Sequence, residues 1–132
     1  MKHSVLGFST AFVFFLLTGG PLAAHHSFMG EFDLSKPITL KGTITKVEWA
    51  NPHISFNVDV KGEGDKVTHW NVQSGNPGAL KERGWTRNSL KPGDRITVVA
   101  YPAKNSEAFA VARSVTLSDG RKLSANSDGV QP

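Results

Sequence analysis

The stretch PITLKGTITKVEWA, residues 37–50, decides how this chain folds. It is rich in β-branched residues and alternates apolar with polar side chains, which is the pattern of a half-buried strand. The apolar positions change parity part-way along: Ile38, Leu40 and Ile44, then Val47 and Trp49. We therefore predict a long, strongly coiled strand with a β-bulge near Thr45 and Lys46.

A hairpin follows this strand. HISFNVDV (53–60) alternates cleanly, and Gly62 and Gly64 supply a turn before the returning strand KVTHWNVQ (66–73). The inward positions of the pair are apolar: Ile54, Phe56, Val58 and Val60, facing Trp70 and Val72. Matching Val58 with Trp70 across the hairpin places His69 opposite Asp59, and His53 opposite Gly75.

One short helix comes next, and two more strands complete the pattern. Asn76 is a good N-cap, Pro77 suits the first helical position, and Gly84 suits the end of the helix. RITVVAYPA (95–103) and AFAVARSVTL (108–117) then have the composition of strands.

This order of elements predicts the fold class. It is all-β with one short helix, and five strands with a helix between the third and fourth form an OB-like Greek-key barrel. The helix end would close one end of the barrel with Leu80, Trp85 and Leu90. A five-stranded β-sandwich is the main alternative. The three tryptophans and the phenylalanines of the strands have inward parity, so they are expected in the core rather than on a stacking surface.

The N-terminal segment has the three parts of a secretory signal peptide. Lys2 precedes the apolar run VLGFSTAFVFFLL (5–17), which is short for a membrane span of about 20 residues. Small residues follow, and the best cleavage point lies after Ala24. The alternative is an uncleaved anchor helix. We thus divide the chain into a signal peptide (1–24), an arm (25–36), a barrel (37–119) and a polar tail (120–132).

Composition excludes several classes of chemistry. There is no cysteine, so disulfides, thiolate ligands and a lipid anchor on cysteine are all excluded. The net charge of +4 is modest, and we expect no nucleic-acid partner and no membrane anchor after cleavage. No nucleophile elbow or phosphate-binding loop is present, so no catalytic residue is assigned and binding is favoured over catalysis.

Cleavage after Ala24 would make His25 the first residue of the mature protein. Its α-amino nitrogen and its imidazole could then chelate one metal ion, since both can be unprotonated near neutral pH. A further histidine would complete an all-nitrogen set, which suits Cu(II); Zn(II) is the alternative.

The further histidine is sought among His26, His53 and His69. His26 is adjacent to His25, and His53 lies at a strand end where the arm could fold over it. His69 would lie roughly 20 Å from His53 along the hairpin and would pair with Asp59, so we exclude it. The predicted metal ligands are therefore His25, His26 and His53. The remaining candidates are oxygen ligands that the sequence does not rank: Glu31, Asp33 and Glu48.

Several segments resemble a family of small exported bacterial proteins that is known only as a domain of unknown function. They are AAHHSF…EFD, KPITLKGTITKVEWANPH, GWTRNSLKPGDRITV and ARSVTLSDGRKL, within residues 23–123. The resemblance implies an OB-type barrel behind a signal peptide, and a shared pattern that includes His25, His26 and His53. It implies no activity.

Taken as a sequence, the chain predicts a soluble periplasmic or secreted barrel that binds a metal ion, with copper favoured. We expect Phe28, Phe32 and Leu34 of the arm to pack against the barrel. The alternative function is a metal-free binding module that docks a periplasmic protein partner or a small ligand.

Overall fold

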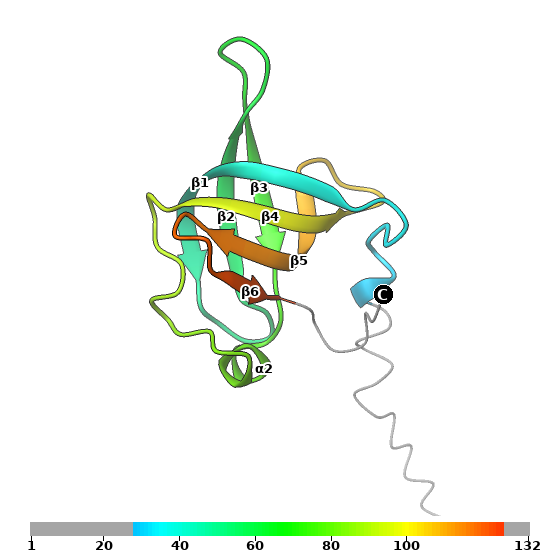
Figure 1. The fold of residues 1–132 in the computed structure, drawn as a ribbon. Helices are drawn as coiled ribbons and strands as arrows, with labels where there is room; N and C mark the ends of the chain where they lie inside the picture. The colour runs from blue at the N-terminus through cyan, green and yellow to red at the C-terminus, as the bar shows by residue number, and fades with distance from the viewer. Residues whose placement is uncertain (1–27, 126–132) are drawn as a thin grey trace, which may run out of the picture.

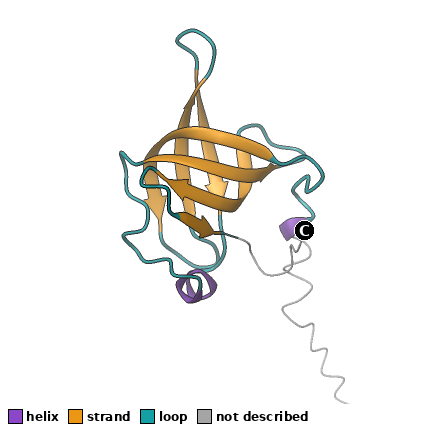
Figure 2. Cartoon of the chain, in the orientation of Figure 1, coloured by secondary structure: helices purple, strands orange, loops and turns teal. Residues whose placement is uncertain are grey.

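The computed structural model describes residues 28–125 and consists mainly of strands (Figures 1 and 2). The elements in chain order are β1 (Ile38–Glu48), β2 (Ser55–Lys61), β3 (Val67–Gln73), α2 (Pro77–Glu82), β4 (Arg95–Pro102), β5 (Phe109–Leu117) and β6 (Lys122–Ser124). No helix within this range is long and apolar enough to cross a membrane.

The strands form one sheet in the order β3-β2-β1-β4-β5-β6, and a parallel pairing of β3 with β5 closes it into a barrel. All other neighbours are antiparallel. Strands β1 to β5 thus form a closed barrel with α2 between β3 and β4, which is the topology of an OB fold. The predicted fold class is confirmed.

Strand β1 takes part in both halves of the barrel. Its first half, from Ile38 to Thr43, pairs with β4, and its second half pairs with β2. The register with β2 shifts between Ile44 and Lys46, so the predicted bulge is present. The bulge explains the change of parity in the sequence, because an extra residue turns the following side chains to the other face.

The core fills the barrel and is closed at one end by the segment around α2. Asn76 Oδ1 accepts a hydrogen bond from Ala79 N at 2.9 Å, and Pro77 begins the helix. Gly84 has a φ of 88°, and Trp85 N then donates to Leu80 O at 3.0 Å. Leu80, Trp85 and Leu90 are all buried in the main core, as predicted.

The C-terminal boundary differs from the prediction. The sequence predicts a polar tail from residue 120, but Lys122–Ser124 form β6 against β5, and Ala125 is fully buried. Trp85 Nε1 donates to Ser124 O at 2.9 Å, and Ala125 N donates to Arg113 O at 3.0 Å. On the side of Ser124 and Ala125 these bonds use backbone groups, so the polar side chains of residues 122–125 do not prevent the segment from joining the barrel.

Candidate functional site

The site is built around the loop between β1 and β2, which carries His53. The loop contains a cis peptide bond between Asn51 and Pro52. Two backbone hydrogen bonds fix its end: Ile54 N donates to Gly75 O at 3.0 Å, and Ser74 N donates to Ile54 O at 2.7 Å. Ile54 is buried in the core, whereas His53 is half-buried at the surface. His53 is therefore held at the rim of the barrel.

The N-terminal arm reaches this loop. The ring of Phe28 stacks on the ring of His53, with centroids 4.2 Å apart and planes 16° apart. Phe28 also meets the edge of Phe32 at 5.2 Å, and Phe32 contacts Phe109 at 5.4 Å. Offset and edge-on ring pairs of this kind contribute about 0.5–1.5 kcal/mol each beyond burial. The predicted packing of Phe28 and Phe32 against the barrel is therefore confirmed.

The loop between β4 and β5 holds the other side of the arm. Lys104 Nζ donates to Gly30 O, and Lys104 N donates to Glu31 O, both at 2.9 Å. Phe32 forms an isolated bridge with Ala103 and is buried with Tyr101 and Val111 in a second apolar cluster. We call Phe28, Phe32 and Lys104, with the contacts just given, the arm latch.

Leu34 does not belong to the arm latch. Its side chain is 41% exposed, whereas the sequence predicts that it packs against the barrel. The chain turns at this point, because Ser35 donates to Asp33 Oδ1 from both its backbone N and its hydroxyl. This turn directs Leu34 to solvent.

The arm latch lies between the β1–β2 and β4–β5 loops. In OB folds these two loops, with the face of the second and third strands, form the usual ligand site. Here the arm bridges them, because Phe28 stacks on His53 of one loop and Gly30 binds Lys104 of the other. A ligand held by the arm and His53 would therefore lie at this end of the barrel.

The predicted metal ligands are only partly described. His53 lies against the arm, whereas His25 and His26 lie outside the described residues, as do the predicted signal peptide and its cleavage point. Among residues 28–125, no three histidine or carboxylate side chains converge into a metal-binding group.

His69 has the role that the sequence predicts for it. It lies opposite Asp59 in the β2–β3 register, and its Nδ1 is 2.6 Å from Asp59 Oδ1. The pair sits on the hairpin, which projects beyond the barrel (Figure 1). His69 and His53 therefore belong to different parts of the molecule.

Two of the carboxylates that the sequence leaves open as ligands have local partners. The hydroxyl of Ser35 lowers the pKa of Asp33 below its ordinary value. Lys46 forms an ion pair with Glu48 and lowers the pKa of that carboxyl, with a smaller contribution from Ser55. Both side chains are ionised at neutral pH and contribute to local structure.

The aromatic residues of the strands and helix end serve the core. Trp85 and Phe56 are buried, and Trp49 and Trp70 are half-buried against them. The guanidinium of Arg87 lies 6.0 Å from the ring centre of Trp49, at the limit of a cation–π contact. None of these contacts forms an open stacking surface on the described part of the chain.

Sequence reasoning misses Lys104 as a member of the site. It lies in a polar loop, and a lysine in a loop carries no signal of its own. Its importance arises because the arm, more than 70 residues earlier in the chain, passes beside it.

These features define an OB-like barrel whose N-terminal arm is fixed between the β1–β2 and β4–β5 loops. The chain belongs to a family of unknown function, DUF6152, whose model matches residues 15–112. No curated protein matches the chain significantly.

Two crystal structures of Rim1, a mitochondrial single-stranded DNA-binding protein from S. cerevisiae, are similar in fold. The first is 13% identical with a TM-score of 0.49, and the match covers 63% of this chain and 93% of that chain. The second, from selenomethionine-labelled protein, is 12% identical with a TM-score of 0.49, over 65% and 97%.

Proposed function

We propose that this protein is exported, is cleaved after Ala24, and binds one metal ion through His25, His26 and His53. Copper is favoured over zinc, because the amine and imidazoles form an all-nitrogen set. Binding, storage or delivery of the metal is favoured over catalysis. The proposed location is the periplasm or the exterior of the cell.

The observation that carries this proposal is the stack of Phe28 on His53. Phe28 is three residues from His25 in the sequence, and three residues of chain span at most about 10 Å. With Phe28 fixed against His53, the α-amine and imidazole of a mature N-terminus at His25 are within reach of the His53 ring. His69, by contrast, is expected roughly 20 Å from His53 along the hairpin, which is too far for the two to share one metal ion.

The stack is compatible with metal binding at His53. Phe28 covers the face of the imidazole, whereas a metal binds a ring nitrogen through a lone pair in the plane of the ring. A ring packed on one face also loses less conformational freedom when it binds a metal, which favours affinity. Phe28 would therefore act as a positioning residue.

The test begins with the N-terminus. Mass spectrometry of the exported protein should give a chain that starts at His25. Purified protein with that start is then compared with a version that carries one extra N-terminal alanine, by competition titration with Cu(II). The extra residue should weaken binding by roughly tenfold or more, which is about 1.4 kcal/mol.

Histidine variants test the rest of the ligand set. His53→Ala should weaken Cu(II) binding to a similar degree, and His69→Ala is the matched control and should leave it unchanged. Electron paramagnetic resonance should show fewer coupled nitrogens in His53→Ala. The site would be rejected if the protein with the native start, the alanine-extended protein and His53→Ala all bound Cu(II) with equal affinity. A metal-free binding module would then be the better description.

A further inference from the structure

The outer face of β1, β4, β5 and β6 carries a row of side chains that runs across the strands. Lys41 pairs with Thr97, Thr97 with Thr116, and Thr116 with Lys122. Lys41 and Lys122 are exposed, and the threonines between them are half-buried. Neighbouring strands are about 4.8 Å apart, so the backbones of Lys41 and Lys122, three strands apart, lie roughly 14 Å from each other. The threonine hydroxyls lie between the two lysines.

Two arginines flank this row. Arg95 lies two residues before Thr97 on β4, so the two side chains share a face, and it pairs with Thr43 of β1. Arg113 is the extra residue of a bulge, because Val99 pairs with Ser114 whereas Ala100 pairs with Ala112. A bulge redirects side chains locally, and Arg113 here lines the outer face together with Lys122.

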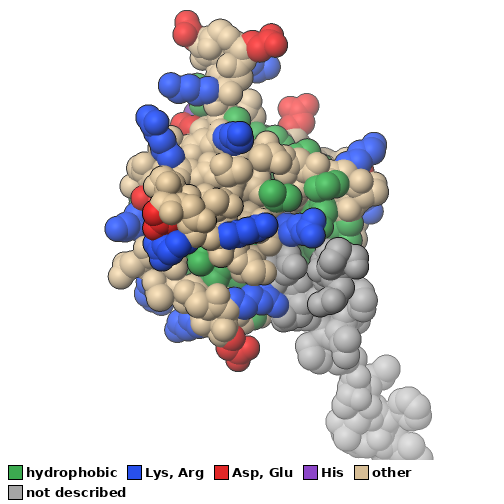
Figure 3. Space-filling model, in the orientation of Figure 1, with side chains coloured by type: hydrophobic (Ala, Val, Ile, Leu, Met, Phe, Trp, Pro, Cys, Tyr) green, Lys and Arg blue, Asp and Glu red, His purple; other side chains and the backbone are tan. Residues whose placement is uncertain are grey.

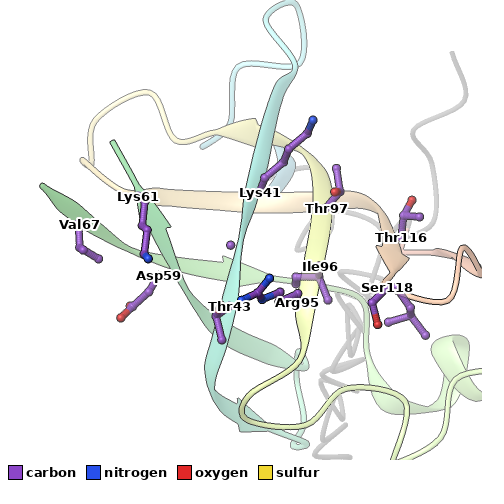
Figure 4. A pocket seen from close by; sticks show the side chains of 12 residues that line it. Lys41, Thr43, Asp59, Lys61, Val67, Arg95, Ile96, Thr97, Thr116 and Ser118 are labelled. Carbon is purple, nitrogen blue, oxygen red and sulfur yellow. The ribbon is translucent and has the colours of Figure 1, made fainter. Parts of the chain in front are cut away.

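The face is hollowed in two adjacent places. The larger hollow, about 650 Å³, is lined by Lys41 of β1, Lys61 of β2 and Arg95 of β4, among others (Figure 4). The smaller, about 400 Å³, receives Arg113 and Lys122. Thr97 and Thr116 line the first hollow, and Val99 and Ser114, the next outward pair on the same strands, line the second.

Among residues 28–125, the cations that line these hollows form no ion pair with a carboxylate. The ion pairs of the described lysines and arginines with carboxylates join Lys46 to Glu48 and Arg121 to Asp119, and neither involves a residue of the hollows. The one acid in the hollows, Asp59, is engaged by His69. Several Lys and Arg side chains lie across the middle of this face, with hydrophobic side chains beside them (Figure 3).

We propose that this face, the cationic row with its two hollows, binds a small polyanion that bears two or more phosphate or carboxylate groups. Lysine ammonium groups and arginine guanidinium groups bind such oxygens with charge-assisted hydrogen bonds, and the threonine and serine hydroxyls can donate further bonds between them. This site is separate from the proposed metal site, which involves the N-terminal arm and His53 of the β1–β2 loop.

Other anionic partners fit this face less well. Single-stranded nucleic acid is bound by basic grooves in which aromatic rings stack on bases, and this row offers Thr, Ser and Val between its cations. Protein interfaces concentrate aromatic residues at their centre and are depleted in lysine. A compact ligand rich in charge needs neither feature.

The probes are inorganic tripolyphosphate and citrate, titrated calorimetrically into metal-free protein at constant ionic strength. The first represents a phosphate source and the second a carboxylate source, and the tighter of the two identifies the chemistry. Lys41→Gln and Lys122→Gln should each weaken binding roughly threefold to fivefold. The double variant should lose tenfold or more, and affinity should fall as salt rises.

Lys81→Gln on α2 is the matched control, because it removes the same charge from an exposed position away from the row. The proposal is overturned if neither probe binds, or if Lys81→Gln weakens binding as much as Lys41→Gln does. It is also overturned if an oligothymidylate binds more tightly than both probes and loses affinity in Lys41→Gln, since the face would then bind a nucleic-acid strand.

Discussion

Gly42 shows how one residue permits the path of β1. A Cβ placed there would lie 2.2 Å from the backbone oxygen of Asp59 and 2.8 Å from a methyl group of Val58. The backbones of β1 and β2 approach closely because β1 leaves β4 at this point and begins to pair with β2. Only glycine allows that approach without displacement of the backbone.

Gly42→Ala should therefore destabilise the barrel. Overpacking of this kind costs about 1–3 kcal/mol, and the clash here is with backbone, so we expect the upper part of that range. Gly62→Ala is the control, since its nearest contact would be an ordinary 3.6 Å and its change should be within about 0.5 kcal/mol. Urea unfolding followed by tryptophan fluorescence measures both. Equal midpoints for the two variants would contradict the role given to Gly42.

At the scale of elements, α2 and β6 depend on a few specific hydrogen bonds. The helix is six residues long and begins at the cap of Asn76. Strand β6 has three residues and depends on pairing with β5 and on the bond from Trp85 to Ser124. Elements this short have little stability of their own, so tertiary contacts decide whether they form.

Replacing the cap tests α2. Asn76→Ala should cost about 1 kcal/mol, because the backbone N–H of Ala79 loses its acceptor. Asn76→Asp keeps an acceptor at the same position and should retain most of the stability. The midpoint of urea unfolding is the measurement. If both variants lose the same amount, the cap bond does not stabilise the helix.

Replacing the indole tests β6. Trp85→Phe removes the donor to Ser124 O and should cost about 1–2 kcal/mol, with faster hydrogen exchange at the amides of β6. Trp70→Phe makes the same chemical change at a half-buried position of β3 that has no bond to β6. It should leave β6 exchange unchanged. Unaltered exchange in Trp85→Phe would mean that pairing with β5 alone holds the strand.

At the scale of the whole molecule, ionised carboxylates connect stability to pH. Three exposed carboxyls have pKa values below their ordinary range: Asp33, Glu48 and Asp119. For Asp119 the cause is its hydrogen bonds with Arg121, from the backbone N–H first and then from the side chain. A lowered pKa in the folded state means that ionisation favours folding.

Stability should therefore be constant from neutral pH down to about 5 and then fall as the pH drops through the carboxyl range near 4. The contribution is fully present above the unfolded pKa and is lost at acid pH, where the net positive charge also rises. Thermal unfolding at pH 7, 5 and 3 measures this. Asp119→Asn should show a smaller loss between pH 5 and 3, and a melting temperature that rises on acidification would contradict the expectation.

The sequence alone determines most of the barrel and part of the site. Alternation and parity predict the strands, the bulge in β1 and the Asp59–His69 pair, because side-chain direction in a strand repeats every second residue. Local chemistry predicts the cap at Asn76 and the end of α2 at Gly84. Parity together with chain reach also selects His53 over His69 as the histidine near the arm.

Only the tertiary structure decides the contacts between segments far apart in the chain. The stack of Phe28 on His53, the bond from Lys104 to Gly30 and the attachment of β6 through Trp85 join residues that share no local pattern. The cationic row arises in the same way, since Lys41 and Lys122 become neighbours of the same threonines only when four strands align. Periodicity specifies which way a side chain points, whereas barrel closure specifies what it meets.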